Sequence, residues 1–205
     1  MQKRRRIFIA INLPEEIKRE LVFYANKWPE LPAKWTVKDN LHITLEFLGY
    51  LTDQELGEVC MIAKEVAKRH NPFSINLNKI VYGPDNGVRP GSDPGLTPRA
   101  PKMIWAEGEK SNELSDLKQD LQEYLLEKIN FKPEGRGFAP HITLARIKEW
   151  EWKKIEPEER PEVNENIDLV FFVESIEVME SELKRGGSQY TILESHLFNN
   201  ETMPR

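Results

Sequence analysis

One tetrapeptide, His-Ile-Thr-Leu, occurs twice in the chain, at 42–45 and at 141–144. Only four histidines are present, and the composition gives each of them a chance of roughly three in ten thousand of being followed by Ile-Thr-Leu. The double occurrence therefore indicates an internal duplication or a shared chemical role. It favours a fold that contains two related halves.

Each tetrapeptide is expected to close a strand–helix–strand unit. In the first unit, alternating β-branched residues predict a strand over 6–13, Pro14 opens a helix that runs to about residue 28, and a second strand covers 41–48. In the second unit, a strand over 103–106 precedes a helix capped by Ser111, and the closing strand begins at His141. The segments 6–48 and 103–147 are thus expected to be the two halves of a repeat.

The segments outside the repeat predict further helices and strands. Thr52 and Glu55 form a capping box for a helix through about residue 69, and a strand over 73–81 follows it. The stretch 83–101 carries Gly or Pro at nearly every second position, which predicts a long loop. Two last strands are expected over 169–179 and 189–198, with Gly186 and Gly187 turning a hairpin between them.

The composition limits the class of protein. A length of 205 residues, 39% of them hydrophobic, suffices for one compact domain or for two small lobes that share a cleft. The single cysteine, Cys60, excludes an internal disulfide and a thiolate metal cluster, which fits a reducing cytoplasm. No apolar run approaches the ~20 residues that cross a bilayer. The net charge of -5 argues against coating of the whole surface with nucleic acid. We expect a soluble cytoplasmic protein whose contact with nucleic acid is local.

The polar side chains of the two tetrapeptides are the candidate catalytic residues. Side chains at i and i+2 share one face of a strand, so His42 lies beside Thr44, and His141 lies beside Thr143. Two imidazoles can donate and accept protons near neutral pH, and displacement at phosphorus needs an acid on one side and a base on the other. The threonine hydroxyls can donate hydrogen bonds to phosphate oxygens. The pair of motifs therefore favours phosphodiester chemistry over a purely structural role.

Other chemistries have weaker support. A zinc site at the two motif histidines would need a third protein ligand, and no spacing indicates one, so we expect neither a metal nor another cofactor. His70, His196 and Cys60 lie outside the duplicated motif, and we assign them no catalytic role.

The chain resembles the 2H phosphoesterase superfamily, whose signature is two His-x-Thr motifs, and within it the RNA 2',3'-cyclic phosphodiesterases, historically called 2'-5' RNA ligases. The resemblance rests on HITLEFLG at 42–49 and PHITLAR at 140–146. It extends to RIFIAINLP at 6–14 and to ESELKRGGSQYTIL from residue 180 onward. It covers nearly the whole chain, and residues 1–205 are expected to form a single bilobal domain.

The resemblance implies a bilobal α+β fold, a pseudo-twofold repeat of strand–helix–strand units whose antiparallel sheets line a central cleft. It implies hydrolysis of RNA ends that carry a 2',3'-cyclic phosphate to a 2'-phosphate, without a metal. It makes His42 the proton donor and His141 the proton acceptor, an order that the symmetric residues themselves do not fix.

The resemblance also places Arg146 beside the bound nucleotide, in contact with its base or phosphate. The odd offset of Arg146 from His141 should turn its side chain to the opposite face of a regular strand, unless the strand ends or bulges near Ala145. Both placements stay open at the level of sequence.

Two alternatives to hydrolysis remain. The same site could join RNA ends through a 2'-5' linkage. This reaction is the reverse of hydrolysis of that linkage, and a catalyst accelerates both directions. Alternatively, the site could bind RNA ends or nucleotides without turnover. The intact histidines and threonines argue against the second alternative. RNA or oligonucleotide ends that carry a 2',3'-cyclic phosphate are the expected partners, no membrane partner is expected, and the oligomeric state is open.

Overall fold

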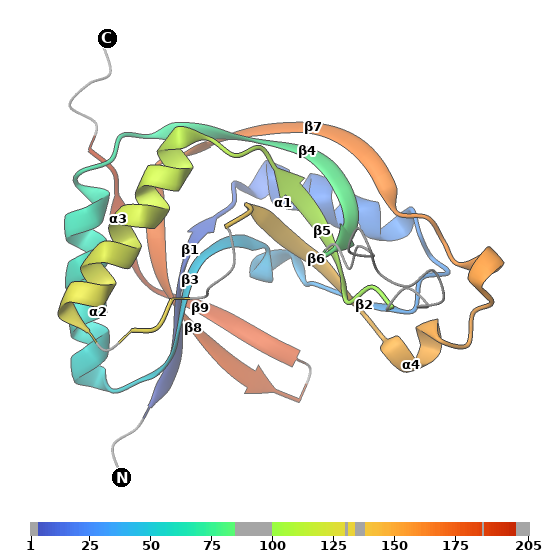
Figure 1. The fold of residues 1–205 in the computed structure, drawn as a ribbon, viewed down its shortest axis with the longest axis horizontal. Coiled ribbons are helices and arrows are strands. Elements are labelled where there is room, and N and C mark those ends of the chain that lie inside the picture. Colours follow the sequence, from blue (N-terminus) through green and yellow to red (C-terminus); the bar gives the residue numbers. More distant parts are fainter. Residues whose placement is uncertain (1–3, 85–99, 130, 134–137, 186, 200–205) are drawn as a thin grey trace, which may run out of the picture.

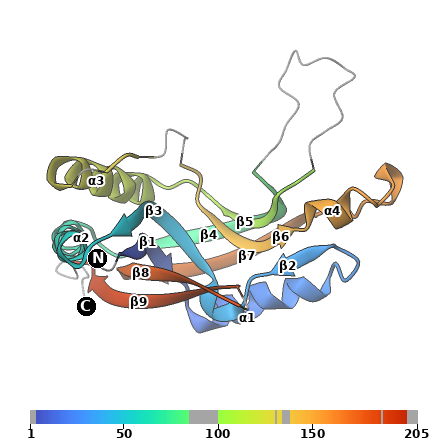
Figure 2. The same ribbon diagram turned by 90° about the horizontal axis from the view of Figure 1, so that it is seen from below.

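In the residues that the computed structural model describes (4–84, 100–129, 131–133, 138–185 and 187–199), nine strands form one curled antiparallel sheet. The strand order is β7-β4-β5-β6-β3-β1-β8-β9, and β2 pairs with β6 outside this path. Helices α2 and α3 lie side by side at one end of the molecule, and α4 lies at the other end (Figure 1). The turned view in Figure 2 shows the same arrangement. The expected α+β class is confirmed.

The strands are β1 (Arg5–Asn12), β2 (Ala33–Trp35), β3 (His42–Leu51), β4 (Phe73–Gly83), β5 (Met103–Gly108), β6 (His141–Ile147), β7 (Asn164–Val173), β8 (Ser175–Lys184) and β9 (Gly187–Leu197). The α-helices are α1 (Glu15–Phe23), α2 (Asp53–Ala67), α3 (Asn112–Lys128) and α4 (Glu149–Trp152). Short 3-10 helices are η1 (Tyr24–Asn26), η2 (Lys38–Asn40) and η3 (Pro157–Glu159).

The sheet consists of two related halves that meet in its middle. Strands β3, β1, β8 and β9 follow one another in one half, and β6, β5, β4 and β7 follow one another in the other. The halves join where Ile43 of β3 pairs with Ile142 of β6. The predicted repeat of strand–helix–strand units is therefore confirmed, and its two closing strands are neighbours.

The two halves also share one irregularity. The register of β3 against β1 skips Leu45, and the register of β6 against β5 skips Leu144. In both strands two consecutive residues, 45–46 and 144–145, are buried. A β-bulge of this kind reverses the alternation of faces in the residues that follow it.

Helices cover the sheet on the face opposite the motif histidines. Helix α2 packs on β1, β3, β8 and β9, and α3 packs on α2 and β3. The isoleucines and leucines of the two tetrapeptides are at most 2% exposed, so they lie in the core as predicted. The partly buried Lys118 of α3 forms an ion pair with the buried Glu46, which holds this helix against β3 at the bulge.

The predicted helix starts at Thr52 and Ser111 are confirmed. The Thr52 backbone N–H donates to the Glu55 carboxylate at 2.7 Å, and the Thr52 hydroxyl accepts from the Glu55 backbone N–H. The Ser111 hydroxyl accepts from the Leu114 backbone N–H at 3.1 Å. Each cap satisfies a donor that the first helical turn leaves without an intrahelical partner.

The single strand predicted over 169–179 is wrong. The chain forms two strands there, β7 and β8, with Glu174 between them, and they pair with β4 and with β1 in different halves of the sheet. No turn residue marks the break, because the chain passes from one half to the other instead of folding back. The hairpin of β8 and β9 is confirmed, with Lys184 opposite Gly187, whereas Gly186 lies outside the described residues.

Smaller differences concern the ends of elements. The first helix ends at Phe23 and continues only as the 3-10 helix η1, and the short strand β2 was not predicted. Strand β3 runs beyond residue 48 to Leu51 because Gly49 adopts a φ of 77°, which glycine tolerates without strain. Most of the predicted loop over 83–101 lies outside the described residues. Among the described residues no helix is long and apolar enough to span a membrane.

Candidate active site

The first motif lies at the start of β3, where its histidine is fixed by two hydrogen bonds. The His42 Nδ1–H donates to the Asn40 carbonyl oxygen at 2.7 Å, because a carbonyl can only accept. In the neutral ring Nε2 is then the acceptor, and the Thr44 hydroxyl lies 3.0 Å from it. The i and i+2 side chains therefore share one face of the strand, as predicted.

The second motif, at the start of β6, repeats the hydrogen bond from the histidine to the backbone. The His141 Nδ1–H donates to the Ala139 carbonyl oxygen at 2.9 Å, again two residues earlier. The Thr143 hydroxyl lies 4.0 Å from the Met103 sulfur. Because the backbone occupies Nδ1 in both motifs, Nε2 is in each case the nitrogen suited to proton transfer.

The sheet brings the two motifs together on one face. The isoleucines at their centres pair directly across β3 and β6. Neighbouring antiparallel strands run in opposite directions, so His42 lies beside Thr143, and His141 lies beside Thr44. Two imidazoles and two hydroxyls thus gather where the two halves of the sheet meet.

The surroundings of His42 favour its neutral form. Burial is the main cause that lowers the pKa of His42 to about 4, and the positive charges of Lys18 and of protonated His141 lower it further. Lys18 lies on α1 and is itself 5% exposed. The rings of Phe8 and Tyr190 lie 5.0 and 5.2 Å from the imidazole.

The hairpin of β8 and β9 contributes Tyr190 to this site. The Asn40 side chain donates to the Ser188 carbonyl oxygen at 2.7 Å and accepts from the Tyr190 backbone N–H at 3.3 Å. The same Asn40 accepts from His42 through its carbonyl. One residue therefore ties the hairpin to the first motif.

The bulge in β6 decides the placement of Arg146. Leu144 and Ala145 are both buried, so the alternation of faces is reversed after them and Arg146 returns to the face of His141 and Thr143. Its guanidinium lies 3.6 Å from the Met103 sulfur, which is also the neighbour of the Thr143 hydroxyl. The structure thus places Arg146 with the motif residues. The odd offset from His141 does not turn its side chain to the opposite face, because the bulge lies between the two residues.

The bulge in β3 places Phe47 in the equivalent position, which sequence reasoning missed. Phe47 follows His42 by the same number of residues as Arg146 follows His141. Phe47 is 49% exposed, and its ring lies 6.0 Å from the ring of Phe8. Comparison of the two repeats residue by residue could have indicated this position, because HITLEF aligns with HITLAR.

Trp105 of β5 is a second residue that sequence reasoning missed. Its indole stacks on the imidazole of His141, with ring centroids 3.9 Å apart and an interplanar angle of 25°. Trp105 lies opposite Thr143 in the sheet, and Ala10 lies opposite Thr44 in the other half. The sequence carries no local signal for this contact, because the pairing of β5 with β6 creates it.

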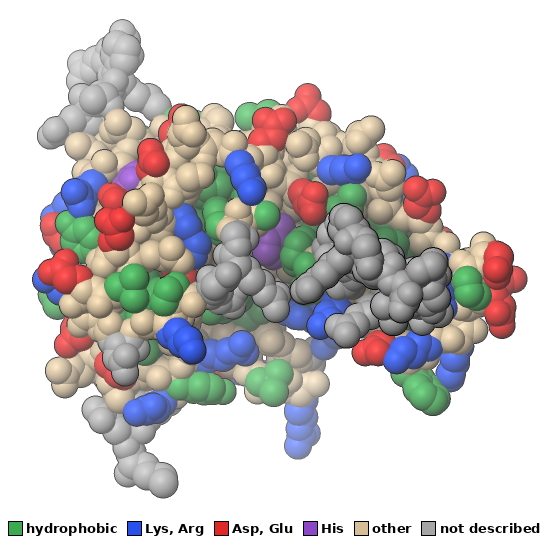
Figure 3. Space-filling model, viewed as in Figure 1, with side chains coloured by type: hydrophobic (Ala, Val, Ile, Leu, Met, Phe, Trp, Pro, Cys, Tyr) green, Lys and Arg blue, Asp and Glu red, His purple; other side chains and the backbone are tan. Residues whose placement is uncertain are grey.

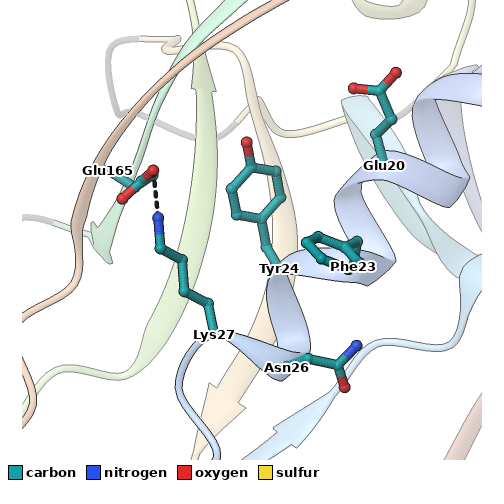
Figure 4. A pocket seen from close by; sticks show the side chains of 6 residues that line it. All are labelled: Glu20, Phe23, Tyr24, Asn26, Lys27 and Glu165. Atoms are coloured by element: carbon teal, nitrogen blue, oxygen red, sulfur yellow. Dashed lines mark ion pairs between the residues drawn. The ribbon is translucent and has the colours of Figure 1, made fainter.

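The space-filling view shows a histidine side chain in a hollow near the middle of one face, with hydrophobic side chains beside it (Figure 3). Two cavities elsewhere contain none of the motif residues. One, of about 470 Å³, lies between the end of α1 and β7 and is lined by Glu20, Phe23, Tyr24, Asn26, Lys27 and Glu165 (Figure 4). The other, of about 480 Å³, lies beside α2 and β9 and includes Cys60.

The remaining histidines lie away from the motifs, each beside a carboxylate. His70 Nε2 lies 3.0 Å from Asp120, and His196 Nε2 lies 3.2 Å from Glu194. Burial raises the pKa of Cys60 to about 11, which keeps its thiol protonated. In the described part of the chain, no three His, Cys, Asp or Glu side chains gather in a way that could hold a metal ion.

A two-half antiparallel α+β fold that sets one His-x-Thr motif from each half on the same face defines a 2H phosphoesterase. The chain belongs to the LigT-like phosphoesterase family, which it matches over residues 11–92 and 104–190. The resemblance seen in the sequence is therefore confirmed.

Relatives support this assignment over most of the chain. A protein of Methanocaldococcus jannaschii named RNA 2',3'-cyclic phosphodiesterase is 29% identical over 189 residues, which are 92% of this chain and 98% of that protein. A Thermus thermophilus protein of the same name is 31% identical over an alignment of 207 residues that covers 96% of this chain and 91% of that protein.

Solved structures agree with the fold. A crystal structure from Thermus thermophilus superimposes with a TM-score of 0.78 at 29% identity and covers 96% of this chain and 99% of that one. The structure of E. coli LigT complexed with 3'-AMP has a TM-score of 0.71 at 22% identity, covering 96% of this chain and 99% of that one, and it supports the fold alone.

Proposed function

We propose that this protein is an RNA 2',3'-cyclic phosphodiesterase that opens the terminal cyclic phosphate of an RNA to leave a 2'-phosphate. The observation that carries the proposal is the direct pairing of the two motifs across β3 and β6, which sets two imidazoles and two hydroxyls on one face. The shared name of the relatives supports the substrate class.

The proposed reaction is an in-line displacement at phosphorus. His141 accepts a proton from water at Nε2, and the water oxygen forms a bond to phosphorus. The bond from phosphorus to the 3'-oxygen breaks, and His42 donates its proton to that oxygen. His42 and His141 are each bonded through Nδ1 to the backbone carbonyl two residues earlier, Asn40 and Ala139, so the order follows the family resemblance rather than the hydrogen-bond pattern.

The environment of His42 suits a proton donor that acts on bound substrate. With a pKa of about 4, its imidazolium is a strong acid. The phosphate anion beside it favours the protonated form, since an opposite charge close to an ionisable group favours the charged state. His42 is therefore protonated to a greater extent in the complex with substrate than in the free protein.

The threonines and the two bulge residues supply binding. Thr44 and Thr143 donate hydrogen bonds to the non-bridging phosphate oxygens, where negative charge grows in the transition state. The exposed ring of Phe47 and the guanidinium of Arg146 offer flat surfaces on which a base can stack, and Arg146 can alternatively bind phosphate. The bulges place both on the face of the motifs.

The test is incubation with an oligonucleotide that ends in a 2',3'-cyclic phosphate, followed by identification of the product. The proposal expects an end that carries a 2'-phosphate and activity that survives a strong chelator. A 3'-phosphate would contradict the assigned leaving group. Joined ends would favour the ligase reaction, binding without turnover would favour a binding protein, and loss of activity with the chelator would favour a metal mechanism.

A further inference from the structure

The contact between Trp105 and His141 is the closest aromatic stacking in the described residues. The centroids lie 3.9 Å apart at 25°, whereas the rings beside His42 lie at 5.0 Å and 5.2 Å and are tilted or edge-on. A large flat ring at this distance restricts rotation of the imidazole about its side-chain bonds. The imidazole of His141 therefore has a ring stacked on its face, whereas the rings beside His42 contact it only at an angle.

The chain leaves space for the indole on its other side. A Cβ atom at Gly83 of β4 would overlap the indole ring of Trp105. Gly83 has an ordinary negative φ, so the close approach of the ring, rather than a special backbone conformation, requires the glycine here. The indole thus fills the space between Gly83 and His141.

Burial of the indole in this place is energetically unfavourable for its N–H group. The Trp105 Nε1–H is buried and has no hydrogen-bond partner among the described residues. An unpaired buried donor is unfavourable, so such groups need a specific explanation. In the other half of the sheet the equivalent position is Ala10, which shows that the fold itself does not need a large ring there.

Resting on the proposed function, we propose that Trp105 is the positioning residue of His141: it holds the imidazole so that Nε2 faces the reacting water, and Gly83 makes room for it. The hydrogen bond from Nδ1 to Ala139 fixes one point of the ring, and the stacked indole fixes its plane. The two halves of the active site are therefore unequal, with only the His141 half carrying this support among the described residues. A displacement of a reacting group by about 1 Å can cost on the order of 10²-fold in rate.

A double-mutant cycle tests whether Trp105 acts through His141. We measure kcat and KM on the cyclic-phosphate oligonucleotide for the wild type, Trp105→Leu, His141→Ala and the double variant. We expect Trp105→Leu to lower kcat by about 10–10²-fold with KM changed less than about 3-fold, and to cost less than about 3-fold once His141 is absent. Trp105→Phe, which keeps a flat ring, should recover most of the loss.

The outcomes separate this proposal from the proposed function. Equal losses from Trp105→Leu in both backgrounds would show that the indole acts independently of His141 and would overturn the positioning role. Absence of cyclic-phosphate hydrolysis by the wild type would overturn the proposed function itself, whereas full activity of His141→Ala would overturn the paired-histidine mechanism. If Trp105→Leu does not fold, Trp105→Phe is carried through the same cycle, with a smaller loss expected and the same criterion of independence.

Two further variants serve as partner and control. Gly83→Ala should displace the indole and lower kcat about 10-fold, but it should have little effect when Trp105 is already leucine, because the overlap is removed. Trp150→Leu is the matched control, since Trp150 is 74% exposed on α4 and should keep wild-type kcat. The His141 ring-proton NMR signals should lose their indole ring-current shift in Trp105→Leu; unchanged signals would contradict the stacking.

Discussion

At the scale of single residues, the two threonine hydroxyls can be separated from the shape of their side chains. Thr44→Val and Thr143→Val keep the shape but lose the donor, so each should reduce transition-state stabilisation by about 2–4 kcal/mol, measured from kcat/KM. Thr→Ser should recover most of the loss. Thr191→Val, at an exposed position of β9, is the control. Normal hydrolysis by both motif valine variants would leave the threonines a structural role alone.

Arg146 should behave as a binding residue. Arg146→Ala is expected to raise KM, because a contact that is equal in the ground and transition states leaves kcat unchanged. Arg146→Lys should be nearly as damaging, since a lysine lacks the flat guanidinium that stacks on a base or forks to phosphate. Arg19→Lys, at an exposed position of α1, is the matched control. Unchanged KM and kcat in Arg146→Ala would show that Arg146 has no role in substrate binding.

Some of these residues could be predicted from the sequence and others could not, for physical reasons. His42, Thr44, His141 and Thr143 were accessible because a short strand fixes which side chains share a face. The placement of Arg146 depended on one extra residue in the strand, which the sequence of β6 alone does not reveal. The contacts of Trp105 depend on the pairing of separate strands and were beyond local patterns.

At the scale of elements, the capping box of α2 should affect stability and not catalysis. Thr52→Ala removes the acceptor for the Glu55 backbone N–H and should lower the free energy of unfolding by about 1 kcal/mol. Helix α2 packs on the face of the sheet opposite the motifs, so kcat should not change. Thr52→Ser should restore stability in denaturant unfolding. A loss of kcat in folded Thr52→Ala would show that α2 is coupled to the site.

Elements with local signals were predicted well, and elements defined by tertiary pairing were not. The caps at Thr52 and Ser111 depend on residues three positions apart, which a sequence displays directly. The break at Glu174 and the strand β2 depend on where distant strands lie. A continuous apolar stretch cannot show that its two ends pair in different halves of a sheet.

At the scale of the whole molecule, the lowered pKa of His42 predicts a pH-dependent stability. The unfolded chain protonates this residue below about pH 6.5, whereas the folded protein does so only below about pH 4. Between these values the unfolded state binds more protons, so the free energy of unfolding falls as the pH falls, by up to about 3 kcal/mol. The contribution is fully present above pH 6.5 and is lost by pH 4.

The comparison of wild type with His42→Asn isolates this contribution, because the carboxylates titrate in both proteins. The difference between the two unfolding free energies should change progressively from pH 6.5 to pH 4 and stay constant above pH 6.5. Parallel curves over the whole range would contradict the burial of a neutral His42.

The two-half plan itself was the best predicted property of the molecule. A repeated tetrapeptide in a repeated strand–helix–strand order leaves few arrangements other than a pseudo-twofold sheet with both motifs at its centre. The differences between the halves, such as Trp105 against Ala10, followed only from the structure, because symmetry in sequence does not extend to the packing around each histidine.

The most direct test of the central claim, that the two halves act together through their histidines, is the kcat of His42→Ala and His141→Ala on an oligonucleotide that ends in a 2',3'-cyclic phosphate. Each substitution should lower kcat by about 10²–10⁴-fold, with the fold retained in circular dichroism. The double variant should lose far less than the product of the two factors, because residues that act as a unit are not additive. A near-wild-type kcat in either single variant would contradict the paired-histidine mechanism.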